Sequence, residues 1–259
     1  MAAPDQGLPD IQLDATALYR EDVYTDRRAG TIRVMTPVTP DGAADHARPT
    51  LYAGQTQLMT PGGVLPLMFE IEASSLAQAI ERFPEAVKRA NLVALLDGIG
   101  VAAFLGIDSC ARLFADRSDL VHFTSALRFP VTLGGKNYGG TPDILATEYT
   151  RREFEEGFLP EVETLRDALW VPLGPAVTAA IASVARRGVL EARHVLAGLP
   201  HPSGANAERI AYFLGRKARE NLSSKVDPAR LDTARSALLG QIAALAPHRP
   251  ASRSTDPAG

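Results

Sequence analysis

The stretch that decides the fold is LWVPLGPAVTAAIASVARRGVLEARHVLAGLPHPSGAN, which runs from Leu169 to Asn206. It begins with a short apolar run, LWVPLG, after which Gly174-Pro175 opens a helical segment, because proline is favoured in the first turn of a helix. A second apolar run, HVLAGL, follows and leads directly to His201. A strand, a helix and a second strand in this order predict a βαβ unit with parallel strands.

The preceding segments extend this pattern. DLVHFTSAL (119–127) predicts a buried strand, LGGKNYGG (133–140) a glycine-rich loop, and four apolar side chains at helical spacing a helix over 158–169. We therefore predict an α/β fold with three α/β/α layers around a central, mostly parallel sheet. Ligands of such sheets bind beyond the carboxyl ends of the strands. FTSALRFP and HPSGAN both leave such ends, so we expect them to share one edge.

The first part of the chain has a different pattern. GTIRVMTPV, from Gly30, predicts a strand, and TLYAGQTQLMTPGGVLPLMFEIEA (50–73) predicts two strands around a Pro-Gly-Gly turn. SSLAQAIERF (74–83) predicts a helix with a serine cap and with Leu76, Ile80 and Phe83 on one face. We expect Pro84 to interrupt this helix, after which a second helix begins.

These patterns predict four parts. Residues 1–29 form a flexible arm, 30–90 a hairpin plus helix, 91–246 the main α/β domain and 247–259 a disordered tail. The segment 30–90 is either the first part of the main fold or a separate small module.

Composition excludes several classes of protein. The 259 residues are 46% hydrophobic and 22% charged, as in an ordinary globular protein, and no apolar run reaches the length of a membrane span. The N-terminal residues lack the features of a signal peptide, so we expect a cytoplasmic protein. The single cysteine, Cys110, excludes a disulfide framework, and the five scattered histidines predict no metal site.

Charge is unevenly distributed. The whole chain carries −3, but residues 181–225 contain eight Arg or Lys against three Glu. This basic segment is either a surface that meets phosphates or a solvated helix face.

The HPSGAN segment contains several candidate site residues. His201 is either a hydrogen-bond donor at a site or a histidine that bonds a neighbouring loop, and Pro202 fixes its direction in both cases. Ser203 and Asn206 can bind phosphate, and they can also cap a helix that starts near Ala207.

GLPHPSGANAERIAYFLGRK (198–217) resembles the His-Pro-Ser loop and following helix of the uracil-DNA glycosylase superfamily. FLPEVETLRDALWVPLG and DLVHFTSALRFPV are similar to the helix, strand and base-recognition segments that precede this loop in the superfamily. The resemblance covers about residues 110–225 and implies a divergent member that acts in base excision repair.

The resemblance implies a DNA repair hydrolase that flips a deaminated base out of the stack and cleaves its N-glycosidic bond without metal or organic cofactor. His201 would donate a hydrogen bond to the departing uracil, and Thr124 or Ser125 would recognise the base. Ser203 would contact a backbone phosphate, and Gly204, Ala205 and Asn206 would line the segment that enters the minor groove. Outside the resemblance, Arg209 would contact DNA if the basic segment is the DNA surface, and Lys136 and Asn137 either contact phosphate or belong to a flexible surface loop.

Two segments depart from the superfamily pattern. In GQTQLM, Gly54 and Gln55 match the first motif, but Thr56 replaces its acidic residue. Phe69 would be the ring that stacks on uracil, or else a core residue of a simple hairpin. FTSALRF lacks the usual asparagine, and a hydroxyl group discriminates less strictly between bases than a fixed amide.

Three hypotheses follow. The first is a monomeric, cofactor-free uracil-DNA glycosylase acting on DNA that contains uracil or other deaminated bases. The second is a nucleic-acid or damage-binding module with little or no catalysis, and the third is an unrelated α/β protein whose HPS loop is only a turn.

Overall fold

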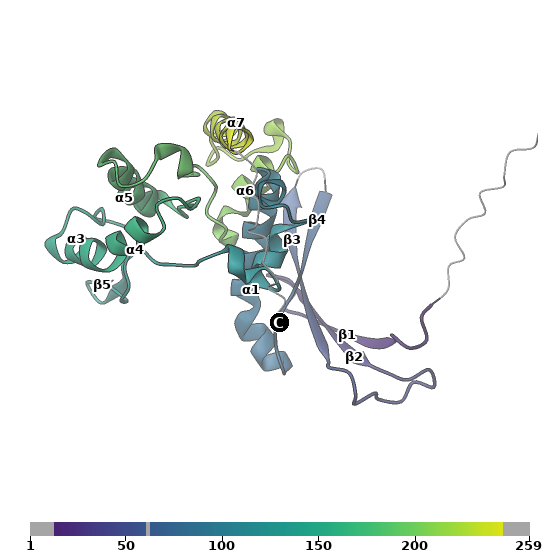
Figure 1. Cartoon of the computed structure of the whole chain (residues 1–259). Helices are drawn as coiled ribbons and strands as arrows, with labels where there is room; N and C mark the ends of the chain where they lie inside the picture. The colour runs from purple at the N-terminus through teal and green to yellow at the C-terminus, as the bar shows by residue number, and fades with distance from the viewer. Residues whose placement is uncertain (1–12, 61–62, 246–259) are drawn as a thin grey trace, which may run out of the picture. The chain divides into compact units, whose positions relative to one another are not determined.

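The computed structural model describes residues 13–60 and 63–245, which belong to two compact units (Figure 1). Of these residues, 13–57 and 66–86 form the first unit, and 58–60, 63–65 and 87–245 form the second. The predicted tail at 247–259 lies outside the described residues.

Most of the first unit is a four-stranded antiparallel sheet with strand order β1-β2-β3-β4, whose β3 and β4 ends at 58–60 and 63–65 are grouped with the second unit. Its strands are β1 (Tyr19–Thr25), β2 (Thr31–Pro37), β3 (Leu51–Thr60) and β4 (Gly63–Glu70). Strand β1, which the sequence assigned to the flexible arm, pairs with β2 along its whole length. The neighbouring strands β3 and β4 form the predicted hairpin.

Helix α1 (Leu76–Gly98) begins where the sequence predicts. The Ser75 hydroxyl accepts a hydrogen bond from the Gln78 amide at 3.2 Å, which confirms the serine cap. The predicted interruption at Pro84 is wrong, because the helix continues through it. A proline inside a helix costs about 3 kcal/mol, and buried residues on both sides of it, from Ala79 to Leu95, offset that cost. Ile80 is 59% exposed and does not join the core face.

The second unit is mainly helical. After the carboxyl-terminal part of α1 it contains α2 (Val101–Leu105), α3 (Glu148–Glu153), α4 (Leu159–Thr164), α5 (Pro175–Arg186), α6 (Ala207–Phe213) and α7 (Pro228–Ala244). A π turn (Phe154–Phe158) joins α3 to α4, and two short strands, β5 (Thr132–Leu133) and β6 (Lys136–Asn137), form a small hairpin.

The second unit has two hydrophobic cores. One joins α1, α2, α6 and α7 through buried side chains that include Leu95, Phe213 and Leu238. The other joins α3, α4 and α5, which group together in Figure 1, around Phe154 and Ile181.

The predicted central, mostly parallel sheet is wrong, and with it the three-layer α/β/α fold. The described residues form only the antiparallel four-stranded sheet and the separate β5–β6 hairpin. LWVPLG and HVLAGL do lie side by side, but they form a single isolated parallel bridge between Trp170 and Val195. Pro172 has no amide hydrogen to continue this pairing, and Gly198, at φ +111°, turns the other segment away.

Two other predicted elements differ. Residues 119–127 contain no strand, and His122 to Ser125 are exposed. The helix predicted over 158–169 ends at Thr164, so the last part of the predicted apolar face lies outside the helix. A short apolar run occurs both in strands and in other partly buried segments. The strand predicted over 119–127 was wrong for this reason.

Candidate functional site

The HPS loop is anchored on both sides of its histidine. Pro200 and Pro202 are buried, whereas His201 between them is exposed. The Asn91 side chain, only 2% exposed, donates a hydrogen bond from Nδ2 to the Pro202 carbonyl at 2.9 Å. Because Asn91 belongs to α1, this contact ties the loop to a long helix and fixes the direction in which His201 leaves it.

The imidazole of His201 has a defined hydrogen-bonding arrangement. The Ser203 backbone N–H donates to Nδ1 at 3.2 Å, so the neutral ring carries its hydrogen on Nε2. Gly174 lies against the ring: a β-carbon there would be 3.7 Å from His201 Cδ2. The loop therefore presents an Nε2–H donor from an exposed, oriented ring.

His201 lines a pocket of about 790 Å³, hereafter the His201 pocket. Two other predicted site residues, Ser125 and Asn137, line the same pocket. The remaining lining residues come from the segments around them and from the start of α5: Ala126, Leu127, Arg128, Phe129, Pro130, Val131, Tyr138, Gly139, Gly140, Thr141, Ile144, Leu173, Gly174, Pro175, Ala176 and Val177. The FTSALRFP and HPSGAN segments thus meet at one pocket although no sheet edge brings them there.

Glycines shape the wall of this pocket. A β-carbon at Gly140 (φ +90°) would lie 2.9 Å from the Ala176 β-carbon, so only glycine allows the glycine-rich loop to approach α5. Gly174 has φ +106°, a conformation that L side chains rarely adopt, and it precedes Pro175 at the start of α5. The predicted Gly174-Pro175 helix start is confirmed.

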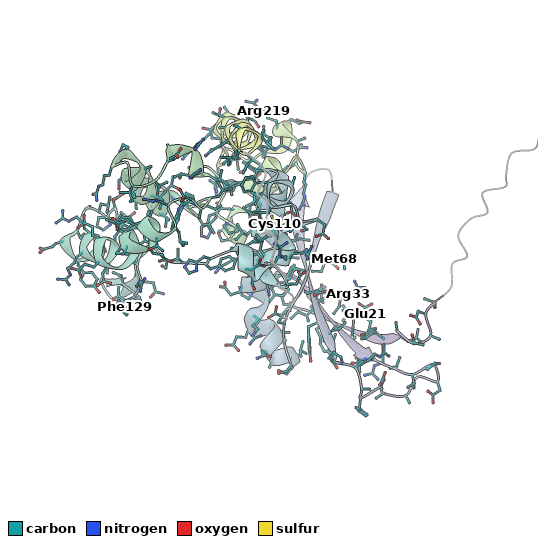
Figure 2. The ribbon with its side chains drawn as sticks, viewed as in Figure 1. Glu21, Arg33, Met68, Cys110, Phe129 and Arg219 are labelled. Carbon is teal, nitrogen blue, oxygen red and sulfur yellow. The ribbon has the colours of Figure 1, made fainter. Side chains whose placement is uncertain are left out.

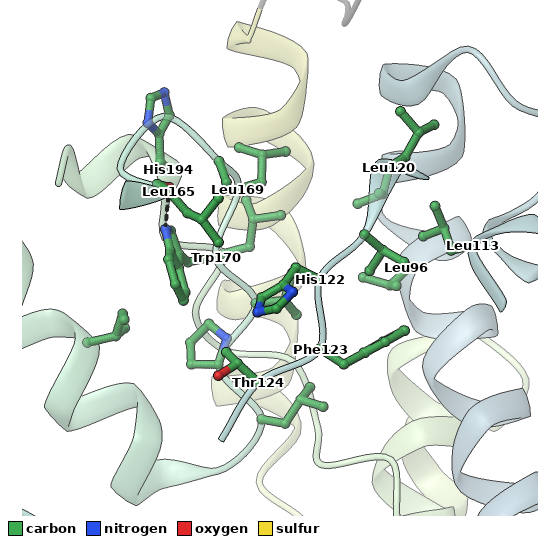
Figure 3. A pocket seen from close by; sticks show the side chains of 18 of the residues that line it. Leu96, Leu113, Leu120, His122, Phe123, Thr124, Leu165, Leu169, Trp170 and His194 are labelled. Carbon is green, nitrogen blue, oxygen red and sulfur yellow. Dashed lines mark hydrogen bonds between the residues drawn. The ribbon is translucent and has the colours of Figure 1, made fainter. Parts of the chain in front are cut away.

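Ser125 also lines a second, mostly apolar pocket of about 880 Å³, hereafter the Trp170 pocket (Figure 3). Its walls come from both cores of the second unit and include Thr124, Leu96 and Trp170. The Trp170 indole donates to the Leu165 carbonyl at 3.2 Å, which fixes the ring.

Thr124 is held by an acidic residue that the sequence did not single out. Its hydroxyl donates to Glu161 at 2.8 Å, and His122 contacts the other oxygen of the same carboxylate. Burial raises the pKa of Glu161, but the hydrogen bonds from Thr124 and His122 and the charge of Arg128 outweigh this and hold its pKa below the usual range. The ionised carboxylate thereby positions the residues that precede Ser125.

The loop between His201 and α6 is held by its own side chains. Gly204 to Asn206 form one 3₁₀ turn, and α6 begins at Ala207, as predicted. The predicted side-chain capping by Ser203 and Asn206 is wrong: Asn206 donates instead to the Ser203 hydroxyl at 3.1 Å.

Other residues predicted to contact DNA differ in accessibility. Gly204 and Ala205 are exposed in the 3₁₀ turn, and Lys136 is exposed in β6. The Arg209 guanidinium donates to Asn206 at 3.0 Å and to the Lys225 carbonyl at 2.8 Å, so its hydrogen-bonding groups are largely used within the protein.

Glu208 ties α6 to the following loop. Its carboxylate accepts from the Lys217 ammonium at 2.7 Å, from the Ser223 hydroxyl and from the Ser223 amide at 2.8 Å, and these contacts lower its pKa from 4.5 to about 2. A pKa depressed on folding contributes stability above pH 4.5 that is lost as the pH falls toward 2.

We therefore expect Glu208→Gln to lower the free energy of unfolding at pH 7 by about 1–2 kcal/mol. The difference from the wild type should shrink as the pH falls from 5 to 2, as measured by urea unfolding. Glu220→Gln, at an exposed position, should change little. A difference for Glu208→Gln that stays constant over this pH range would contradict the assignment.

Gly54, Gln55 and Phe69 belong to the first unit. A β-carbon at Gly54 would lie 2.2 Å from the Phe69 ring, and Phe69 makes an edge contact with Phe83 at 5.3 Å between ring centroids. Gln55 pairs with Thr31 in the sheet. These contacts explain Phe69 as a residue that packs against the core of the first unit, the alternative that the sequence left open.

The described residues contain no cluster of three or more His, Cys, Asp or Glu side chains suited to a metal ion. No helix in the same part of the chain has both the length and the apolar character needed to cross a membrane.

Sequence reasoning missed Asn91, Glu161 and Phe129. Asn91 is a polar residue inside the apolar run ANLVALL, and Phe129 is an aromatic residue between an arginine and a proline. Those local contrasts were the available signals, but the contrast at Asn91 does not reveal that its partner is the Pro202 carbonyl.

No protein-family model matches the chain, and no solved structure matches it. Over 140 residues the chain is 32% identical to the uncharacterized protein YoxB of Bacillus subtilis (strain 168), an alignment that covers 53% of this chain and 54% of YoxB. The chain thus spans about half the length of the curated relative that it matches, and the name of that relative states no activity.

Proposed function

We propose that this protein is a monofunctional, cofactor-free DNA glycosylase that hydrolyses the N-glycosidic bond of uracil or another deaminated base. It acts as a monomer in the cytoplasm, and its partner is DNA that contains such a base. The observation that carries the proposal is the His201 pocket, where an imidazole whose Nδ1 accepts from the Ser203 amide shares the lining with the hydroxyl of Ser125 and the amide of Asn137.

The chemistry of base excision suits these groups. Water attacks the sugar carbon, the bond between sugar and base breaks, and the electron pair leaves with the base as an anion. A donor aimed at a carbonyl oxygen of the base is worth most when this charge develops, and His201 Nε2–H is such a donor. The leaving base then takes a proton from water.

Ser125 and Asn137 supply recognition of the base. A hydroxyl both donates and accepts, and an amide has one group of each kind, so together they fit the carbonyl and N–H edge of a deaminated base. The hydroxyl can reverse its direction, which favours tolerance of more than one base over strict selection of uracil.

A second candidate function is supported by one specific observation. None of the described residues that line the His201 pocket is Asp or Glu, so these residues supply no carboxylate to orient the attacking water. A damage-binding module with slow or no turnover is therefore the alternative.

Oligonucleotides that each contain one damaged base separate the two functions. We expect alkali treatment after incubation with the protein to cleave strands that held uracil or another deaminated base, and not strands with the four normal bases. Binding of the damaged strands without cleavage would favour the binding module. Equal binding of damaged and undamaged strands, with no cleavage, would contradict both.

A further inference from the structure

Phe129 is an exposed aromatic residue at the rim of the His201 pocket. The residue is 64% exposed, and it lies at the outer edge of the group formed by α3, α4 and α5 (Figure 2). Among the described residues, no ring contact or cation–π contact involves it. Leu133 of the same segment is 58% exposed. An aromatic ring left in water beside a pocket has its face available for a planar ligand.

The charges around Phe129 indicate the nature of that ligand. Among the described residues that line the pocket, Arg128 is the only Arg, Lys, Asp or Glu. Its side chain is 58% exposed, and its Nη2 lies 4.0 Å from Glu161 Oε2. Lys136 of β6 is exposed as well. The segment 127–142 contains these two cations and no Asp or Glu. Cations that alternate with an exposed aromatic ring are typical of surfaces that bind single-stranded nucleic acid, where bases stack on the ring and phosphates meet the cations.

The loop after His201 favours a single strand over a duplex. A protein that extrudes a base from a duplex pays a free-energy cost for unpairing and unstacking. Gly204, Ala205 and Asn206 offer no large apolar side chain to fill the gap that such a base would leave. A single strand requires no such filling.

We propose that the Phe129 ring is a stacking platform for an unpaired base of single-stranded DNA, with Arg128 and Lys136 contacting the adjacent phosphates. That the neighbouring nucleotide enters the His201 pocket rests on the proposed glycosylase function; the stacking itself does not.

The test uses the full-length protein and a fluorescent single-stranded oligonucleotide with normal bases only, so that binding is measured without excision. Phe129→Ala should raise Kd about fivefold or more, the effect of losing one base–aromatic stack. Phe123→Ala is the matched control, because Phe123 is 58% exposed but stacks on Phe114 at 5.0 Å and lines the other pocket. Its Kd should stay within twofold.

A spectroscopic variant reports the contact directly. Phe129→Trp should retain affinity, and single-stranded DNA should quench its emission beyond the change seen in the wild type, whose one tryptophan is Trp170. A Kd unchanged by Phe129→Ala, an unquenched Phe129→Trp, or wild-type binding that is absent or equally tight to the duplex would overturn the proposal. Stacking without excision of any damaged base would leave the stacking proposal standing and refute the glycosylase function. Excision of a damaged base with no effect of Phe129→Ala on binding would support the glycosylase function and refute the stacking proposal.

Discussion

His201→Ala is expected to lower the rate of base excision by about 10²-fold or more. The substitution removes the Nε2–H donor, and loss of one preorganised donor to a developing anion typically has an effect of this size. The ring is exposed and its one described hydrogen bond is to the neighbouring Ser203 amide, so the free energy of unfolding should change little. Single-turnover excision and urea unfolding measure the two quantities.

His46→Ala is the matched control for this variant. His46 is an exposed histidine of the first unit and takes no part in the proposed site. Its substitution should leave the excision rate within about twofold of the wild type. A His201→Ala protein that excises within a few-fold of the wild-type rate would remove His201 from the mechanism.

Asn91→Leu is expected to have the second large effect. Leucine has a similar size but no donor, so the buried Pro202 carbonyl would lose its partner at a cost of about 1–3 kcal/mol in the free energy of unfolding. The loop would also lose the contact that directs His201. We expect kcat for excision to fall at least tenfold with little change in the Kd for DNA, because the binding surface itself remains.

Leu238→Ala separates positioning from stability. Leu238 is 1% exposed in α7, and its truncation should cost about 2–5 kcal/mol without leaving a polar group unpaired. At a temperature where both variants are folded, Leu238→Ala should retain kcat and Asn91→Leu should not. Equal kcat values for the two variants would show that Asn91 serves stability alone.

Local signals in the sequence predicted local structure well. Ser75 caps α1, Gly174-Pro175 opens α5 and α6 starts at Ala207, because caps and proline act within a single turn. The error at Pro84 shows the limit of such signals, since the packing on both sides of the proline decides whether the helix continues.

The local sequence pattern could not show whether the parallel sheet forms. Trp170 and Val195 do pair in parallel, but one proline and one glycine with a positive φ end the pairing after a single bridge. Whether a short apolar run becomes a strand depends on neighbours that are distant in the sequence.

The sequence predicted some of the residues that line the candidate site, but not the residues that hold them in place. His201 could be selected by its position after an apolar run, Ser125 by the resemblance of its segment and Asn137 by its glycine-rich loop. These three of the predicted residues line one pocket. Asn91, which is 110 positions before His201 in the sequence numbering, and Glu161 act through contacts that only the fold creates.

The central claim is tested most directly by detecting the released base. Wild-type protein is incubated with a single-stranded oligonucleotide that contains one deoxyuridine, and the products are analysed by mass spectrometry. The account predicts free uracil and an oligonucleotide with an intact backbone and one abasic site. An oligonucleotide that keeps its uracil under conditions where the protein binds it would contradict the claim that the His201 pocket performs base excision.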